Sequence, residues 1–515
     1  MAESRHSACT PCWRVWGGWA AGVCALSALM GAVGLAAGGC TPLVRVDVRG
    51  DAVSSEGDLA ALGELSPLEG AWQKADVWPR RWGVPRGGAT RYGVITKIKG
   101  PIAPLRHGDE SSKKVEEEMV QDIRTLLDAR RSPSWRDSVT AVAEGRGSFV
   151  YQYERPLEER VDPPPTAAAF FLKFISGTRV REAGEAASAA DGQGPAGRGR
   201  GARGREYRVQ MQRTWIGYYP PVVTVGSAPA GASDGVTTQT TPPTSSTSSA
   251  PAPLPTPRAL VVVLPGIFGT PATLVDQCVS TLRARGYGVV RLLAHPSRFT
   301  ERVLFDYTGT SDEEFDAFAK RIAAELGDRV AECAYAIEDA VERIARERPE
   351  TEGLSRIALG MSGGAMVLPT VVAKNPEPYT AAVLIAGGVD FCRVAVESNY
   401  APWIDAVTIR WQGKPLTKDQ SRRLSDAYSR HAPLDSRFTI SALAEKPVLM
   451  LQALGDEAVP AELGDEMWLR AGRPDRWVFD TGHELLFAAL SGHLGAIADW
   501  IDNAVPRGVE WSPAP

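Results

Sequence analysis

Three separate segments carry side chains that could together perform nucleophilic catalysis. Ser362 lies within a Gly-Met-Ser-Gly-Gly segment, Asp456 within Gly-Asp-Glu-Ala-Val-Pro, and His483 within Thr-Gly-His-Glu. A serine hydroxyl is a poor nucleophile until a base removes its proton, and an imidazole titrates near neutral pH. A carboxylate can hold that imidazole in one tautomer. These residue types suit acyl transfer with a serine nucleophile, a histidine base and an aspartate that orients the base.

The surroundings of Ser362 predict a sharp turn between a strand and a helix. Residues 355–359 have the aliphatic content of a short buried strand, and residues 365–368 can open a helix. Glycines on both sides of the serine allow neighbouring backbone to approach a crowded turn. We therefore expect an outward-facing Ser362 whose adjacent amide is free to bind an oxyanion.

From Arg258 onward, apolar strands alternate with helical segments, which is typical of a parallel sheet covered on both faces. We predict an α/β domain with a mostly parallel sheet and helices on both faces. Ser362, Asp456 and His483 each follow a predicted strand. The carboxyl ends of parallel strands share one edge of a sheet, so the three side chains can converge there. The predicted strands are 259–264, 289–293, 355–359, 383–386, 448–451 and 477–479, with helices at 272–285 and 311–348.

These features, in the chain order Ser, Asp, His, resemble the α/β-hydrolase fold family over residues 258–501. The resemblance implies Ser362 as nucleophile, His483 as general base and then acid, and Asp456 as orienter. It assigns the oxyanion hole to the amides of Gly363 and Ile267, although the Pro265-Gly start of that loop departs from the common His-Gly. Residues 428–460 are similar to the dienelactone hydrolase and acetylesterase branches.

Several other acidic and histidine residues are candidate members of the site or candidate metal ligands. Asp390 follows a predicted strand and is the alternative acid. His431 and His493 are interpreted as structural or surface residues. His483-Glu484 begins a zinc-protease motif, but Phe487 stands where the second histidine must be, so no metal and no other cofactor is expected.

The first forty residues form an export signal pattern, with Arg5 and Arg14 before an uncharged, apolar stretch. Small residues directly precede Cys40, which resembles the lipobox of bacterial lipoproteins, although that family usually has leucine where Ala37 stands. The resemblance implies a lipid on Cys40 that anchors the exported chain to a bacterial membrane. A single transmembrane anchor is the alternative, because the uncharged stretch is long enough to cross a bilayer.

Shifts in composition divide the chain into segments. The predicted order is a signal peptide (1–39), a region of unknown role (40–147), leading strands (148–225) with a flexible insertion (183–204), a Ser/Thr/Pro-rich linker or loop (226–257) and the catalytic domain (258–515), in which 392–445 is an excursion suited to a cap.

The composition is ordinary for a globular protein and excludes few classes of function. The net charge of −4 over 515 residues gives no general attraction to nucleic acid, so no nucleic-acid partner is expected. The sequence predicts an exported serine hydrolase that cleaves a small carboxylic ester or acyl substrate through an acyl-enzyme. Two alternatives stay open: a peptidase or acyltransferase with the same three residues, and a surface binding protein with a vestigial hydrolase domain. The oligomeric state stays open as well.

Overall fold

The computed structural model describes residues 45–48, 93–97, 149–151, 168–182, 207–222, 255–266, 270–294, 303–404 and 406–505. The chain divides into two compact units, Met1–Val44 and Arg45–Pro515, and all described residues belong to the second. Within the described ranges, no helix is long and apolar enough to cross a membrane. The predicted signal peptide, Cys40 and the insertion 183–204 lie outside the described residues, as does most of the linker.

A parallel sheet forms the centre of the second unit, in the strand order β14-β13-β10-β9-β6-β7. Every neighbouring pair in this series is parallel. The predicted fold class is therefore confirmed, and the strand arrangement is that of an α/β-hydrolase fold. The strands are β6 (Leu260–Leu264), β7 (Gly288–Ala294), β9 (Arg356–Met361), β10 (Tyr379–Ile385), β13 (Val448–Ala453) and β14 (Asp475–Phe479).

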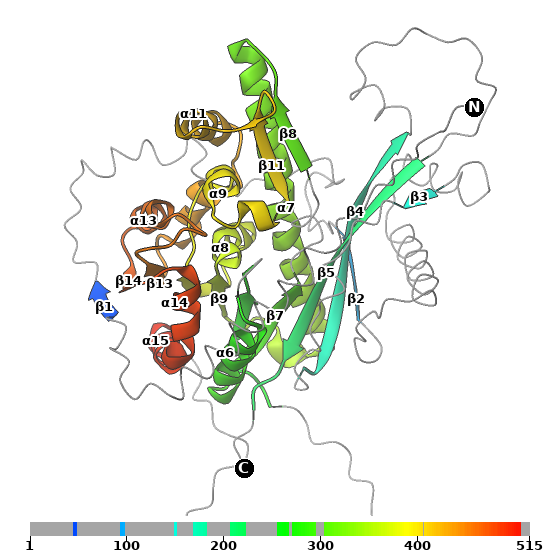
Figure 1. Cartoon of the computed structure of the whole chain (residues 1–515). Coiled ribbons are helices and arrows are strands. Elements are labelled where there is room, and N and C mark those ends of the chain that lie inside the picture. Colours follow the sequence, from blue (N-terminus) through cyan, green and yellow to red (C-terminus); the bar gives the residue numbers. More distant parts are fainter. Residues whose placement is uncertain are drawn as a thin grey trace, which may run out of the picture. The chain divides into compact units, whose positions relative to one another are not determined.

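Antiparallel strands extend the sheet at both edges (Figure 1). Beyond β7 lie β5 (Tyr207–Tyr219), β4 (Phe170–Glu182) and β2 (Gly93–Lys97), while β3 (Phe149–Tyr151) pairs with β5. At the opposite edge, β1 (Arg45–Val48) runs antiparallel to β14, with Arg45 opposite Phe479. Strands β4 and β5 are each 13 residues long, because they pair with each other well beyond the apolar stretches visible in the sequence.

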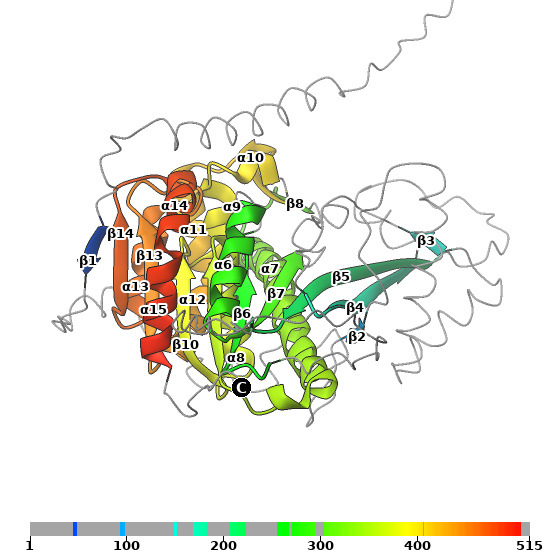
Figure 2. The ribbon, with the colours of Figure 1, turned by 90° about the horizontal axis from the view of Figure 1, so that it is seen from below.

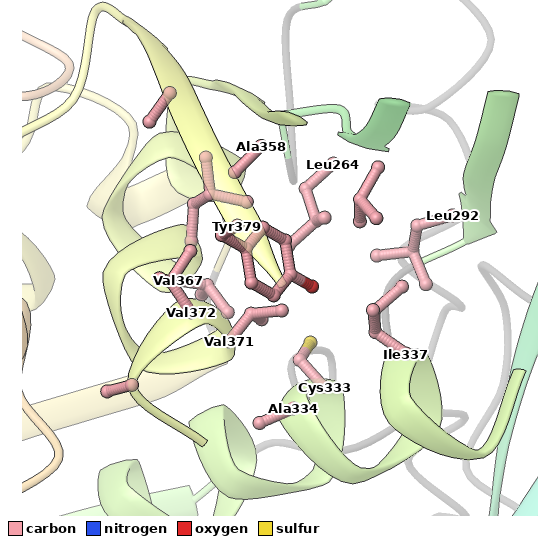
Figure 3. Close-up of a cluster of buried hydrophobic side chains, with 14 of the residues drawn as sticks. Leu264, Leu292, Cys333, Ala334, Ile337, Ala358, Val367, Val371, Val372 and Tyr379 are labelled. Atoms are coloured by element: carbon pink, nitrogen blue, oxygen red, sulfur yellow. The ribbon is translucent and has the colours of Figure 1, made fainter. Parts of the chain in front are cut away.

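Two hydrophobic layers cover the two faces of the parallel strands. Side chains along a strand point alternately to opposite faces, so Val261 and Val263 belong to one layer while Val262 and Leu264 belong to the other. Figure 3 shows part of the second layer, where Leu264 and Ala358 from the sheet meet helix residues. The first layer contains α6 (Ala272–Ala284), α14 (His483–Leu490) and α15 (Leu494–Ala504), and the second contains α7 (Asp312–Glu347), α8 (Gly363–Lys374) and α13 (Ala461–Arg470) (Figure 2).

A small second sheet, in the order β12-β11-β8, forms the centre of what we call the cap. The predicted excursion at 392–445 supplies β11 and β12, but their partner β8 and the first half of α7 come from residues outside it. Trp411 packs against Tyr307 and Phe315, with ring centroids 4.7 and 5.4 Å apart. The cap elements are β8 (Val303–Tyr307), α9 (Phe391–Glu397), α10 (Ala401–Ile404), β11 (Val407–Trp411), β12 (Lys414–Pro415) and α11 (Lys418–Ser429). Outside the cap, α12 (Ser436–Thr439) and the 3-10 turn η6 (Ile440–Leu443) pack on α8, and the turns η5 (Pro349–Thr351) and η7 (Ser491–His493) precede β9 and α15.

The long helix α7 joins the cap to the main sheet. Its first turn is fixed by a capping box, in which the Glu314 amide donates to Ser311 Oγ and the Ser311 amide donates to Glu314 Oε2. Phe318 near its start lies in the core of the cap, whereas Ile337 lies in the layer against the main sheet. One continuous helix therefore sets the position of the cap over the sheet.

Candidate active site

Ser362 lies at the turn between β9 and α8 with a backbone φ of +51° and ψ of −123°. A residue with a side chain rarely adopts this conformation, so the turn is strained and needs support from its neighbours. The Ser362 amide supplies part of that support by donating to the Ile385 carbonyl of β10, at 2.7 Å. The strand-to-helix turn predicted from the sequence is present.

Two of the flanking glycines are required by close backbone contacts. A Cβ atom on Gly364 would lie 2.2 Å from the Leu264 carbonyl oxygen and 2.4 Å from that of Pro265. A Cβ atom on Gly360 would lie 2.6 Å from the Cα atom of Ala365. The end of β6 therefore packs directly on the first turn of α8, which no larger residue at position 364 would permit.

The structure brings Ser362, His483 and Asp456 together in a hydrogen-bonded chain. His483 Nε2 lies 3.0 Å from Ser362 Oγ, and His483 Nδ1 lies 2.7 Å from Asp456 Oδ2. All three are buried, with His483 only 1% exposed. Since a carboxylate only accepts hydrogen bonds, Nδ1 carries a proton here and Nε2 is left to accept the proton of the serine.

The backbone after β13 fixes the second carboxylate oxygen of Asp456. The amides of Ala458 and Val459 donate to Asp456 Oδ1, at 3.0 and 2.8 Å. Their donation leaves Oδ2 directed at the imidazole. His483 is the first residue of α14, so the turn after β14 holds it opposite this carboxylate.

One of the two predicted oxyanion donors can be placed. Gly363 is the first residue of α8, and the amides of a first helical turn have no acceptor within the helix. The positive end of the helix dipole adds to their attraction for an anion. Ile267 lies outside the described residues, so this second donor is not placed. The Gly266 amide donates to Thr270 Oγ1 at 3.1 Å. Among the described residues, no cluster of three or more His, Cys, Asp and Glu side chains is suited to holding a metal ion.

Aromatic residues that the sequence did not indicate surround the imidazole. The rings of Tyr400 and Phe487 each meet His483 in an edge contact, with centroids 5.9 and 5.1 Å away. Phe487 is four residues after His483, so a helix beginning at His483 places the two side chains on the same face. Tyr400 comes from the cap, and no local pattern connects it with the histidine.

Asp390, the alternative acid, lies in a different buried cluster. Ser425 donates to its carboxylate and Arg437 forms an ion pair with it. The neighbouring Asp435 accepts from the amide of Asp390 and from the hydroxyl of Tyr428, at 2.9 and 2.8 Å. The group joins the end of β10 to the cap helix α11, and the carboxylate bonded to His483 is that of Asp456.

Burial of Asp390 predicts a specific pH dependence of stability. Desolvation raises the pKa of this carboxyl to about 6, although Arg437 opposes the increase. Because the folded pKa exceeds the unfolded value, the carboxyl's contribution is complete below about pH 4 and is lost as the pH rises to about 6, a change of about 3 kcal/mol. Asp390→Asn cannot titrate. We expect its unfolding free energy, subtracted from that of the wild type, to give a difference that falls by about 2 kcal/mol of this total between pH 4 and 6.

Urea unfolding of both proteins, followed by circular dichroism at pH 4, 5, 6 and 7, measures this difference. A difference that stays constant between pH 4 and 6, or rises with pH, would show that the carboxyl is not buried in its neutral form.

Comparisons with known proteins give weak similarities. No protein-family model matches the chain, and no curated protein matches it. An acylaminoacyl peptidase of Pyrococcus horikoshii is 12% identical with a TM-score of 0.34, over 66% of this chain and 49% of the peptidase. A puromycin-hydrolysing peptidase of Mycobacterium tuberculosis is 17% identical with a TM-score of 0.34, over 68% and 42%. An esterase domain of a Rhodothermus marinus protein is 15% identical with a TM-score of 0.29, over 56% and 92%.

The matched region therefore spans about half or less of each peptidase's length. Because these similarities are so low, the chemistry of this chain rests on its own side chains.

Proposed function

We propose that this chain is a serine hydrolase that cleaves carboxylic esters through an acyl-enzyme intermediate. The observation that carries the proposal is the chain of hydrogen bonds from Ser362 through His483 to Asp456, at 3.0 and 2.7 Å. A strained backbone at the serine and nearly complete burial of the histidine support it. A structural serine in a tight turn would need neither of these partners.

Acylation uses each residue in a separate role. His483 Nε2 takes the proton from Ser362 as Oγ attacks the ester carbonyl carbon, and Asp456 stabilises the imidazolium that results. The Gly363 amide faces the negative charge that develops on the carbonyl oxygen. The tetrahedral intermediate then breaks its bond to the alcohol oxygen, which receives the proton from His483.

Deacylation repeats these steps with water in place of the serine. His483 removes a proton from water, the resulting hydroxide attacks the acyl carbon, and the serine oxygen leaves with a proton returned by the imidazolium. Transfer to another acceptor would follow the same course with a different nucleophile. A peptidase or an acyltransferase with the same three residues would therefore differ from the ester hydrolase only in the groups that enter and leave.

Covalent labelling with a fluorophosphonate, followed by mass spectrometry of the labelled peptide, tests the proposal. We expect the label on Ser362 and none when His483 is replaced by alanine. A folded wild type that resists labelling would favour the surface binding protein instead. Short p-nitrophenyl esters, thioesters and peptide anilides then separate the three classes of leaving group, and we expect the esters to be cleaved fastest.

We also propose that the chain is exported and attached to a bacterial membrane through a lipid on Cys40. Support comes from the arginines, the apolar stretch and the small residues before this cysteine. Growth with a labelled fatty acid should mark the wild type but not Cys40→Ala. Labelling that persists in Cys40→Ala would contradict the lipid anchor, and membrane retention without any fatty acid would favour the transmembrane alternative.

A further inference from the structure

A short cap segment, Ser398–Tyr400, bonds to both loops that carry the partners of the nucleophile. The Asn399 amide donates to the carbonyl of Glu457, the residue after Asp456, at 3.0 Å. The Tyr400 hydroxyl donates to Glu484 Oε1, beside His483, at 2.5 Å. The Tyr400 amide donates to Ser398 Oγ at 3.1 Å, which stabilises the turn within the segment.

The Tyr400 ring also forms one side of the space around the imidazole. It meets the His483 ring at an interplanar angle of 85°, and Phe487 meets that ring at 69° from α14. Both are edge contacts, a favourable arrangement for aromatic rings. Asp456 and Ser362 are hydrogen-bonded to the two nitrogens of the imidazole. Two hydrogen bonds and two ring contacts therefore restrict rotation of the imidazole.

The charges near the segment are consistent with a tyrosine that keeps its proton. Burial, and then the Glu484 carboxylate, raises the pKa of Tyr400, with a smaller contribution from Asp456. A neutral hydroxyl can donate to Glu484 throughout the neutral pH range. The groups that face the imidazole are thus the Asp456 carboxylate, the Ser362 hydroxyl and the rings of Tyr400 and Phe487, with the Glu484 carboxylate at the far end of the tyrosine.

From this geometry we propose that Tyr400 is a positioning residue of the cap, whose ring, packed edge-on against the His483 imidazole, fixes that imidazole and keeps water from it. The proposal rests on the hydrolase function proposed above. An imidazole that can rotate, or that water can reach, loses the alignment needed to take the serine proton. Docking of the cap therefore completes the arrangement of the base.

The rate of fluorophosphonate inactivation tests this role. In Tyr400→Ala the imidazole can rotate away from the serine and water can reach it, so fewer encounters transfer the serine proton. We expect a maximal inactivation constant about tenfold lower. The KM for a short ester should stay within about threefold of the wild type. Tyr400→Phe keeps the ring and should retain a constant within about threefold of the wild type.

Phe305→Ala provides the matched control. Phe305 is a partly buried cap aromatic that packs against Phe318 with centroids 6.4 Å apart, so its replacement removes a ring from the cap that has no contact with Ser398–Tyr400 or His483 among the described interactions. It should retain the wild-type constant. Thermal unfolding of each variant establishes that it is folded.

The outcomes separate this proposal from the proposed function. A wild type that does not label overturns the proposed function and this proposal with it. A labelled wild type overturns this proposal alone if Tyr400→Ala has unchanged constants, if only its KM changes, or if Tyr400→Phe loses as much as Tyr400→Ala.

Discussion

Ser362→Ala should lose at least about 10⁴-fold in kcat on p-nitrophenyl acetate, because the alanine has no atom that can form the acyl bond. Removing the hydroxyl leaves His483 and Asp456 bonded to each other, so the rest of the site stays in place. Alanine at φ +51° is about as strained as serine, and the strand-to-helix turn should persist. Steady-state hydrolysis, with titration of active sites in the wild type, measures the loss.

Ser436→Ala is a suitable control for Ser362→Ala. Ser436 is fully buried and donates to the Gly388 carbonyl at 3.0 Å, so its replacement also removes a buried hydroxyl from this domain. We expect a stability loss of about 1 kcal/mol and wild-type turnover. Hydrolysis by Ser362→Ala at the rate of this control would rule out Ser362 as the nucleophile.

Asp456→Asn should lose about 10⁴-fold in kcat/KM near neutral pH, by reversing the tautomer of His483. The amides of Ala458 and Val459 both donate to Oδ1, so the asparagine oxygen has to occupy that place. Its NH₂ group then points at His483 Nδ1, which must accept. The proton moves to Nε2, the atom that faces Ser362, and the base can no longer take the serine proton.

Asp390→Asn is the matched control for Asp456→Asn, because both changes neutralise a buried carboxylate. Asp390 is bonded to Ser425 and Arg437, and activity should stay within about threefold of the wild type. Nitrogen NMR of the imidazole would report the tautomer directly. Equal losses in the two variants, or a protonated Nδ1 in Asp456→Asn, would contradict the assignment of Asp456.

The central strands could be predicted because their sequences already reflect their surroundings. Residues 260–264 are apolar without interruption, as a parallel strand buried on both faces requires, and all five are buried. The cap sheet had no such pattern. Leu304 in β8 is 56% exposed, β12 has two residues, and β8 and β11 pair across about a hundred residues of sequence, so no local window reports their contact. The four residues of β1 are similarly defined only by their pairing with β14.

The central sheet and the residue types of the candidate site follow from the amino-acid sequence. Ser362 and His483 could be selected because each stands in a local motif that follows an apolar strand. Asp390 and Asp456 each follow such a strand, and spacing could not decide between them. Only the tertiary structure did so, since the bond from Asp456 Oδ2 to His483 Nδ1 depends on how two loops face each other in space. The same applies to Tyr400, which reaches the imidazole only because the cap packs over the sheet edge.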